Sequence, residues 1–458
     1  MTYKVFVWYL NQLDKWMWSY ILFFLLIGVG IFFTIRLKGM QFRYLGYSLK
    51  LAFTRSDQDA EGDISQFQSL MTALAATIGI GSIAGVATAI VAGGFGAVFW
   101  MWMIALVGMA TKFIEAILAV KYREIDKNGR MCGGPMYYLA NGLQLRWLGV
   151  IFSICCLLAT LCGGNLIQAH SIAIACTELI PCSVIWPGVI MAVLTAFVLF
   201  GGIKNIAKIS GLLVPIMALL YIVSGLFILY VRYDRVWEGF LTIIQTAFTG
   251  QAAVGGFLGA SVMMAIQLGA ARGISSNEAG MGSAPIAAAA AKTDVPGRQA
   301  LISMSGVFFS SFVVCTITAL VISVTDVLGT IGANGEALNG VALVIQAFRI
   351  IPGGEFIVIL GVILFGYTTI IGWSYYGEKS MEFLFKGLLQ KSYRILFCFC
   401  VFLGSIMSIE IVWPLADIMN GLMTIPNLIG LIGLSSIACK EAQHFFQLLS
   451  QEKKAAFD

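Results

Sequence analysis

Apolar segments long enough to cross a lipid bilayer recur along almost the whole chain. A spanning helix needs about 20 predominantly apolar residues. Eleven segments meet that length: residues 17–36, 70–92, 97–121, 147–179, 184–202, 209–231, 241–271, 298–324, 354–384, 392–412 and 414–437. Only 11% of the residues are charged and the mean hydropathy is +0.90, whereas soluble domains have about 25% charged residues. Because helices satisfy their own backbone groups in lipid, we predict an all-α membrane protein with eleven transmembrane helices.

The distribution of lysine and arginine supports this count and gives an orientation. Positively charged residues in short loops stay on the cytoplasmic side of a membrane. If the N-terminus is outside, most of the 28 lysines and arginines fall in the inner loops. The exceptions are Lys4, Lys15, Arg232, Arg235 and Arg349 on the outer side and Lys112 within a span. We therefore expect an outer N-terminus and a cytoplasmic C-terminus.

The rest of the composition indicates one membrane domain over residues 1–458. The longest hydrophilic stretches are residues 37–69, 122–146, 272–297 and 325–353. The first apolar segment has no basic region before it and Arg36 directly after it, so we interpret it as a retained helix and not a signal peptide. The net charge of +5 follows from the basic inner loops and implies no nucleic-acid partner. The ten cysteines show no metal-ligand spacing.

Three glycines interrupt the second apolar segment near its middle. Gly79, Gly81 and Gly85 lie within the run Leu74-Ala-Ala-Thr-Ile-Gly-Ile-Gly-Ser-Ile-Ala-Gly-Val86. A break in a spanning helix frees backbone N–H and C=O groups, each of which costs roughly a few kcal/mol in hydrocarbon. Such a break persists where it lines a polar cavity or binds a ligand, although glycines also allow close packing of membrane helices. We therefore predict a transporter.

A second glycine-rich interruption lies in the seventh segment, at Thr249-Gly-Gln-Ala-Ala-Val-Gly-Gly-Phe-Leu-Gly259. The two interrupted segments are five helices apart, and a repeat with an odd number of helices must insert in the opposite direction. We predict an inverted five-plus-five repeat, with halves over residues 70–231 and 241–437. An extra N-terminal helix within residues 1–36 precedes it, and residues 438–458 form a cytoplasmic tail. Broken helices at matching positions of two halves indicate a substrate site between them.

Five motifs resemble the sodium:alanine (alanine/glycine:cation) symporter family. The run Gly93-Gly-Phe-Gly-Ala-Val-Phe-Trp-Met-Trp-Met-Ile-Ala-Leu-Val-Gly108 is similar to the signature of that family. Four more runs resemble it: Gly79-Ile-Gly-Ser-Ile-Ala-Gly85, Gly133-Gly-Pro-Met-Tyr-Tyr138, Gly255-Gly-Phe-Leu-Gly259 and Arg272-Gly-Ile-Ser-Ser-Asn-Glu-Ala-Gly-Met-Gly-Ser-Ala-Pro285. The resemblance extends from about residue 65 to 385. It implies a leucine-transporter-like fold, a plasma-membrane location and import of alanine or glycine driven by sodium.

The first break departs from the family pattern at one position. Family members commonly carry Gly-Thr-Gly-Asn there, whereas this chain has Gly79-Ile80-Gly81-Ser82. In the family that asparagine contributes to substrate binding, so Ser82 leaves room for a larger side chain or weakens carboxylate binding. The resemblance therefore leaves two alternatives open, a transporter of a larger neutral amino acid and a sensor that binds an amino acid without transporting it.

Candidate sodium ligands follow from the break and from the ninth segment. Sodium, a hard cation, prefers oxygen ligands. The break presents backbone carbonyls near Thr77 and Ile80, and the ninth segment carries adjacent hydroxyls at Thr368 and Thr369. The resemblance assigns these two threonines to the sodium site, opposite the first broken helix. The structural alternative is that each hydroxyl bonds its own i−4 carbonyl.

A zwitterionic amino acid needs hydrogen-bond donors for its carboxylate and acceptors for its ammonium group. Half-helix N-termini at the breaks offer donors, and glycines let the ligand approach the backbone. Gln168 is an amide that can donate and accept, and the family has a glutamine in this context that touches substrate. A hydrogen bond between helices is its structural alternative. The expected substrate contacts are Gly81, Ser82, Gly85, Gln168, Gly255, Gly256, Thr369 and Trp373, with Trp373 closing the pocket or simply packing.

Charged residues inside the predicted spans are few. Lys112 and Glu115 are three residues apart, which lets them pair on one helix face, and we interpret them as structural. Glu178, Glu410 and Asp417 lie near the ends of predicted spans, where we expect water to reach them. Without an unpaired acid at mid-depth, and with only two histidines, the chain favours sodium over proton coupling.

Two other classes of membrane protein fit the sequence poorly. An enzyme needs a nucleophile with its base, or metal ligands, and the chain contains neither H-E-x-x-H nor G-x-S-x-G. A channel needs a continuous pore with rings of ligands, whereas an inverted repeat within one chain is typical of transporters. The expected partners are therefore an amino acid, sodium and the lipid bilayer.

Overall fold

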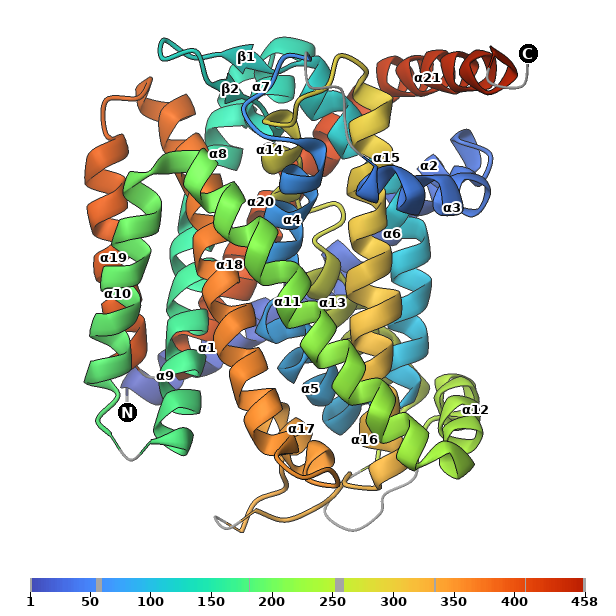
Figure 1. Ribbon diagram of the computed structural model, residues 1–458, viewed down its shortest axis with the longest axis vertical. Coiled ribbons are helices and arrows are strands. Elements are labelled where there is room, and N and C mark those ends of the chain that lie inside the picture. The colour runs from blue at the N-terminus through green and yellow to red at the C-terminus, as the bar shows by residue number, and fades with distance from the viewer. Residues whose placement is uncertain are drawn as a thin grey trace.

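The protein is almost entirely helical in its computed structural model, which describes residues 2–54, 60–180, 182–251, 259–332, 335–407 and 409–455 (Figure 1). Within these ranges the strands form one short antiparallel hairpin, β1 (Glu124–Ile125) and β2 (Met131–Cys132). Glu124 pairs with Cys132, and Ile125 pairs with Met131. The predicted all-α membrane class is confirmed, because seven continuous helical stretches of the described chain are long and apolar enough to cross a membrane.

The helices of the first half of the chain include three short π-helical turns (η1, η3 and η4) and one 3₁₀ turn (η2). They are α1 (Thr2–Trp16), η1 (Met17–Leu22), α2 (Phe23–Arg36), α3 (Met40–Phe53), α4 (Gln66–Thr77), η2 (Ile80–Ser82), α5 (Ala84–Gly93), α6 (Gly96–Lys121), α7 (Pro135–Tyr137), η3 (Tyr138–Gly142), α8 (Arg146–Leu161), η4 (Cys162–Leu166), α9 (Ile167–Leu179), α10 (Ile185–Phe200) and α11 (Gly202–Val231).

The helices of the second half include one further π-helical turn, η5. They are α12 (Tyr233–Thr249), α13 (Val262–Asn277), α14 (Ala284–Ala289), α15 (Pro296–Val307), η5 (Phe308–Cys315), α16 (Thr316–Thr325), α17 (Gly340–Phe348), α18 (Gly354–Phe385), α19 (Gln390–Ile406), α20 (Ile409–Gly433) and α21 (Ser435–Ala455).

Most predicted segments coincide with observed helices to within a few residues. The predicted segment 97–121 is α6, the segment 298–324 is the continuous stretch of α15, η5 and α16, and the segment 354–384 is α18. The glycine-rich interruption predicted within residues 241–271 coincides with a helix break, because α12 ends at Thr249 and α13 begins at Val262. α12 carries exposed aromatic residues and buries only a narrow apolar face. It therefore lies along the outside of the bundle (Figure 1).

Two helix interruptions meet inside the bundle. The first separates α4 from α5 at residues 78–83, as predicted. The second separates α13 from α14 at residues 278–283, where Glu278 adopts φ +55 and Gly280 and Gly282 adopt φ +89 and +84. This second interruption lies in the stretch 272–297, which we expected from the sequence to be one of the hydrophilic loops. The structure shows instead that the stretch contributes to the interior of the bundle. α13 contacts α5, and α14 contacts α4, which places the two interruptions side by side.

The two ends of the bundle differ. Figure 1 shows α21 and the β hairpin at one end and α12 and α17 at the other, which we call the α21 end and the α12 end. The N-terminal helix path of α1, η1 and α2 crosses behind the bundle (Figure 1) and contacts α20 and α13. Gly421 of α20 makes room for it, because a Cβ there would lie 2.5 Å from Cε of Met17.

Candidate functional site

A cavity of about 70 Å³ lies between the two interruptions, and we call it the central cavity. A buried water needs about 10–15 Å³ of such space, so the cavity holds a ligand the size of roughly five water molecules. Its lining residues are Ala76, Thr77, Gly79, Ile80, Gly81 and Gly85 around the first interruption, Gly163, Ile167 and Gln168 of η4 and α9, Arg272, Ser275, Glu278 and Met281 around the second, Thr369 and Trp373 of α18, and Trp413, Ala416, Asp417 and Asn420 of α20.

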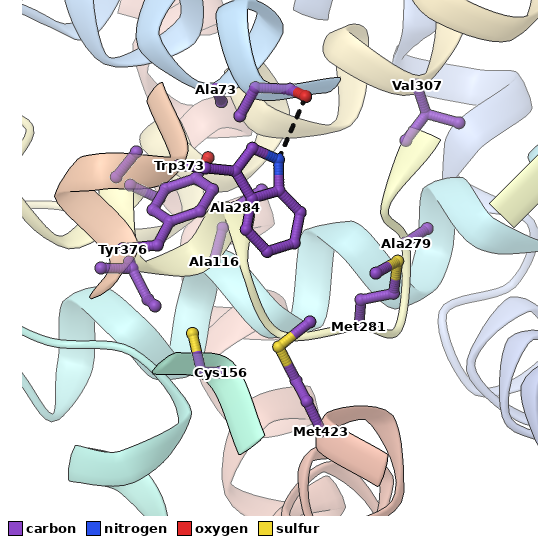
Figure 2. Packing of buried hydrophobic residues seen from close by; sticks show 14 of the residues in the cluster. Ala73, Ala116, Cys156, Ala279, Met281, Ala284, Val307, Trp373, Tyr376 and Met423 are labelled. Atoms are coloured by element: carbon purple, nitrogen blue, oxygen red, sulfur yellow. Dashed lines mark hydrogen bonds between the residues drawn. The ribbon is translucent and has the colours of Figure 1, made fainter. Parts of the chain in front are cut away.

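Side chains of α18 bind carbonyl groups that the first interruption frees. A helix leaves its last four carbonyls without partners inside the helix. The Thr369 hydroxyl lies 2.8 Å from the carbonyl oxygen of Phe365, four residues earlier in its own helix, and 3.0 Å from that of Ala75. The bond to its own helix, which the sequence analysis gave as the structural alternative, is therefore present. The Trp373 indole N–H donates to the carbonyl of Ala76 at 3.3 Å. Figure 2 shows Trp373 beside Tyr376, with ring centroids 5.6 Å apart. The end of α4 is therefore held against α18, and the Thr369 oxygen keeps lone pairs for the cavity.

Two glycines permit this close approach. A Cβ at Gly79 would lie 2.5 Å from Oγ1 of Thr369, and a Cβ at Gly164 would lie 2.4 Å from Cβ of Trp373. A larger residue at either position would push α18 away from the cavity. At Gly81, by contrast, the nearest atoms to an added Cβ belong to Ser275 and are 3.9 Å away, so a methyl group there would make ordinary van der Waals contact without displacing a helix.

Two amide side chains offer acceptors to the central cavity. The Gln168 amide donates to the carbonyl of Gly163 in its own helix at 3.1 Å, so the alternative of a bond between helices is not what is observed. Within the described chain, Oε1 of Gln168 and Oδ1 of Asn420 are buried without a hydrogen-bond partner. Because buried polar atoms are normally paired with protein groups or water, these two oxygens are acceptors available to a ligand or a water molecule in the cavity.

Buried charges of α6 support the second interruption. Lys112 donates to the carbonyl of Asn277 at 3.0 Å, and Glu115 accepts a hydrogen bond from the N–H of Gly282 at 3.0 Å. The expectation that Lys112 and Glu115 simply pair with each other is therefore wrong. Glu115 also accepts a hydrogen bond from the Asn427 amide of α20 at 2.6 Å. The two charged side chains therefore bind the end of α13, the segment after it and α20, where freed backbone groups need partners.

Glu278 places a carboxylate at the cavity wall. Its side chain is only 2% exposed, and it accepts a hydrogen bond from the hydroxyl of Ser283 at 2.6 Å. Lys112 lies within electrostatic reach of both Glu278 and Glu115. The second interruption thus places one buried cation beside two buried carboxylates, and their attraction offsets part of the cost of burying these charges.

Arg272 and Asp417 join α13 to α20 at the side of the cavity toward the start of α13. Nη1 of Arg272 lies 3.5 Å from Oδ2 of Asp417, and its guanidinium carbon lies 5.8 Å from the centre of the Trp413 ring. Asp417 is only 9% exposed, so it is largely buried against Arg272, whereas the sequence analysis expected a solvated residue at the end of a span. The side chains of Glu178 and Glu410 lie outside the described part of the chain.

The structure brings most of the predicted site residues to one place. Those that line the central cavity are Thr77, Ile80, Gly81, Gly85, Gln168, Thr369 and Trp373. Gly255 and Gly256 lie outside the described residues.

Ser82 and Thr368 are buried but do not belong to the cavity lining. The carbonyl of Ser82 accepts a hydrogen bond from the Thr318 hydroxyl at 3.2 Å. The Thr368 hydroxyl lies 3.0 Å from the carbonyl of Phe365 and 3.5 Å from Sδ of Met217. Both residues hydrogen-bond to groups outside the cavity lining, through the carbonyl of Ser82 and the hydroxyl of Thr368, and among the described residues Oγ of Ser82 is buried without a partner.

Sequence reasoning missed the contributions of the second interruption and of α20. Those residues are Arg272, Ser275, Glu278, Met281, Trp413 and Asn420. A signal was present in the run Asn277-Glu-Ala-Gly-Met-Gly-Ser283, which has alternating glycines like the first break. The charged residues of the surrounding stretch 272–297 gave it the composition of a loop. A charge buried against a partner from another helix cannot be recognised from composition alone.

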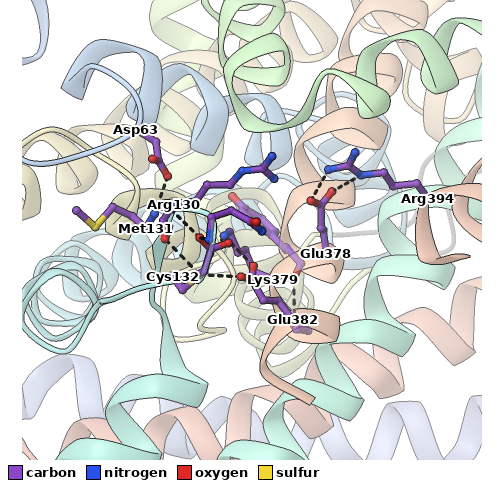
Figure 3. A network of polar contacts seen from close by, with 12 residues as sticks. Asp63, Arg130, Met131, Cys132, Glu378, Lys379, Glu382 and Arg394 are labelled. Carbon is purple, nitrogen blue, oxygen red and sulfur yellow. Dashed lines mark hydrogen bonds and ion pairs between the residues drawn. The ribbon is translucent and has the colours of Figure 1, made fainter. Parts of the chain in front are cut away.

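A second polar cluster lies at the α21 end, between the β hairpin and α18 (Figure 3). Ligand atoms of Asp126, Cys132 and Glu382 lie within 4.8 Å of one another. Nζ of Lys379 is 2.8 Å from Glu382 and 3.1 Å from Sγ of Cys132, so a lysine already supplies positive charge there. Burial raises the pKa of the Cys132 thiol to about 12, which keeps the thiol protonated at neutral pH. We interpret this cluster as structural.

Comparison with known proteins finds relatives along the whole chain. The model of the sodium:alanine symporter family matches residues 3–458. The chain is 47% identical to the sodium/alanine symporter AgcS of Methanococcus maripaludis over 98% of this chain and 100% of that protein. It is 37% identical to the probable sodium/glutamine symporter GlnT of Bacillus subtilis, over 96% and 90% of the two chains. It is 33% identical to the putative sodium/proton-dependent alanine carrier YrbD of Bacillus subtilis, over 98% and 94%.

Proposed function

Because the chain belongs to the sodium:alanine symporter family, we propose that it imports a small neutral amino acid, alanine or glycine, together with sodium. The observation that carries this proposal is the central cavity between two interrupted helices. Its volume of about 70 Å³ suits a small amino acid better than glutamine, the substrate in the name of one relative. A transporter of larger neutral amino acids and a non-transporting sensor are the alternatives.

We place the substrate carboxylate at the start of α5. The first N–H groups of a helix lack partners inside the helix and carry a partial positive charge. Gly81 and Gly85 line the cavity there, and the side chain of Arg272 approaches Gly85, since a Cβ at that glycine would lie 3.9 Å from Cδ of Arg272. The carboxylate thus meets backbone donors and one nearby cation.

The substrate ammonium group then faces the opposite wall. Oε1 of Gln168 and Oδ1 of Asn420 are unpaired acceptors, and the carboxylate of Glu278 lines the same cavity. Trp373 and Met281 border the space left for the substrate side chain. In this arrangement Ser82 lies outside the cavity lining and affects the site only indirectly, through the hydrogen bond that its carbonyl accepts from the Thr318 hydroxyl.

We place sodium between the end of α4 and α18. Hard cations are bound by carbonyl and hydroxyl oxygens, and broken membrane helices supply such carbonyls. The proposed ligands are the carbonyls near Thr77 and Ile80 and the hydroxyl of Thr369, with Thr368 as a further candidate from the adjacent position. Thr369 is favoured because it lines the cavity.

We propose eleven spans in an inverted five-plus-five arrangement, as in the leucine-transporter-like fold. α13 and α14 then form the second broken span, five spans after α4 and α5, and α12 lies along the membrane surface before it. The path of α1 and α2 is the extra N-terminal span. The α21 end faces the cytoplasm, because most loop lysines and arginines fall on that side, and the membrane is the plasma membrane.

Transport by reconstituted protein tests the proposed function. Proteoliposomes are given radiolabelled alanine or glycine with an inward sodium gradient, and separately with a proton gradient alone. We expect accumulation only with sodium. Accumulation driven by protons alone would contradict sodium coupling, binding without accumulation would favour the sensor, and accumulation of only larger neutral amino acids would change the substrate class.

Replacement of Gln168 by alanine should raise the KM for alanine about tenfold, since a hydrogen bond to a charged group contributes about 1.5–3 kcal/mol. Uptake at saturating substrate should change little. Asn165→Ala is the matched control, because this buried amide in the same helical stretch donates to the carbonyl of Phe397 at 2.8 Å and does not line the cavity. An unchanged KM in Gln168→Ala would remove this residue from the site.

A further inference from the structure

A second cavity, of about 360 Å³, adjoins the central cavity, and we call it the outer cavity. Arg272 and Asp417 line both cavities, so this ion pair forms the wall between them. The other α13 residues in the lining of the outer cavity, from Met264 to Ala271, all precede Arg272 along the helix. The outer cavity therefore extends from the ion pair toward the start of α13, away from the second interruption.

The N-terminal helix closes the opposite side of the outer cavity. Asp14, Lys15 and Trp18 belong to its lining, although this helix is not part of the proposed repeat. The indole N–H of Trp18 donates to the carbonyl of Asp417 at 3.0 Å. The extra helix is thus fixed to the wall that separates the two cavities.

The charges around the outer cavity are balanced but incompletely paired. Two carboxylates, of Asp14 and Asp417, face two cations, of Lys15 and Arg272. Among the described residues, Oδ1 of Asp14 and Nε of Arg272 are buried without a hydrogen-bond partner. Apolar side chains, including Leu268, complete the lining. Separated charges of both signs beside an apolar surface match a zwitterion with an apolar side chain.

We propose that the outer cavity is a binding site for zwitterionic amino acids. Asp14 accepts the ammonium group, and Lys15 and Arg272 bind the carboxylate. The pair of Arg272 and Asp417 is long, at 3.5 Å, and a bound carboxylate competes with Asp417 for the guanidinium. The substrate then passes to the central cavity when Arg272 leaves Asp417, a step that rests on the proposed transport function.

The outer cavity, of about 360 Å³, is larger than the central cavity, of about 70 Å³. The outer cavity holds amino acids that the central cavity of about 70 Å³ excludes. A large neutral amino acid such as phenylalanine therefore binds at the outer cavity, inhibits alanine uptake and is not itself transported. Selection by charge takes place at the outer cavity, and selection by size takes place at the central one.

Binding of radiolabelled phenylalanine to the purified full-length protein in detergent tests the site without requiring transport. We expect saturable binding to the wild type and a dissociation constant raised about tenfold or more in Asp14→Asn, because an ionic hydrogen bond to the ammonium group is lost. Asp234→Asn is the matched control, since this exposed acid at the start of α12 lies outside the outer cavity. Ala271→Leu, which fills the outer cavity, should weaken binding by a different route.

Uptake into proteoliposomes gives the second measurement. Phenylalanine should inhibit sodium-driven alanine uptake by the wild type and should not accumulate inside. Absent phenylalanine binding, or equal binding by the wild type, Asp14→Asn and Ala271→Leu, overturns the outer site even if alanine is transported. Accumulation of phenylalanine also overturns it. A different outcome would separate the two proposals. If alanine is not taken up but phenylalanine still binds and Asp14→Asn weakens that binding, the proposed transport function is contradicted and the outer site is supported.

Discussion

Replacement of Thr369 by alanine is expected to raise the sodium concentration for half-maximal alanine uptake by about 10- to 100-fold, the range for loss of a partner at a metal site. The Thr369 hydroxyl lines the central cavity and lies 3.0 Å from the carbonyl of Ala75. Its loss removes a proposed sodium ligand and one polar contact between α18 and the end of α4, while the bond from Trp373 to Ala76 remains. Initial uptake rates measured against sodium concentration, at saturating alanine, give the shift.

The neighbouring threonine provides an internal comparison. Thr369→Ser keeps the hydroxyl and should retain near wild-type sodium dependence. Thr368→Ala removes a hydroxyl that lies near Phe365 and Met217, so we expect a smaller shift than for Thr369→Ala. Sodium dependence equal to the wild type in both alanine variants would mean that sodium binds elsewhere.

The apolar pattern of the sequence was enough to predict most of the helices and the first interruption. Span length and helix breaks at glycines follow from lipid solvation of the backbone, which acts locally and can be read from one segment. Gly81 was predicted from the break itself, whereas the resemblance to the symporter family pointed to Gln168 and Thr369, and all three line the central cavity. The resemblance thus brought together side chains from segments that local physical rules treat separately.

The second half of the site was hidden because its charges are compensated by distant partners. Glu278 lies in a stretch whose composition is typical of a loop. Its place in the interior becomes clear only from its burial near Lys112 of α6. Asp417 was placed in water for the same reason, although it faces Arg272 from another helix. Sequence distance conceals such pairs, since the cost of burying each charge depends on a residue more than a hundred positions away.

The position of α12 is a second feature that the sequence pattern alone did not predict. Its apolar residues continue into α13 along the sequence, so the two helices read as one interrupted span over 241–271. In the structure its exposed aromatic residues and charged first turn keep α12 on the outside of the bundle. The true interruption beside the cavity lies one helix later, where Gly280 and Gly282 take positive φ angles.

Replacement of Lys112 by methionine is expected to lower the free energy of unfolding by about 3–5 kcal/mol, because it leaves buried carboxylates without their cation. Lys112 is 3% exposed, donates to the carbonyl of Asn277, and lies within electrostatic reach of Glu115 and Glu278. The variant should also lose most alanine uptake, since the second interruption forms one wall of the central cavity. Thermal unfolding in detergent and uptake in proteoliposomes measure the two effects.

Lys121→Met on the same helix is the matched control. Lys121 pairs with Glu441 at a partly exposed position, where an ion pair contributes about 0–1 kcal/mol, so its loss should leave stability and uptake almost unchanged. The double variant Lys112→Met with Glu115→Gln removes a cation and an anion together and should recover part of the lost stability. Because Glu278 retains its charge in that variant, recovery remains partial. If Lys112→Met unfolds at the wild-type temperature, the carboxylates around it do not depend on this cation, and the bonds of Glu115 and Asn427 to Gly282 and Gly280 are enough to hold the second interruption.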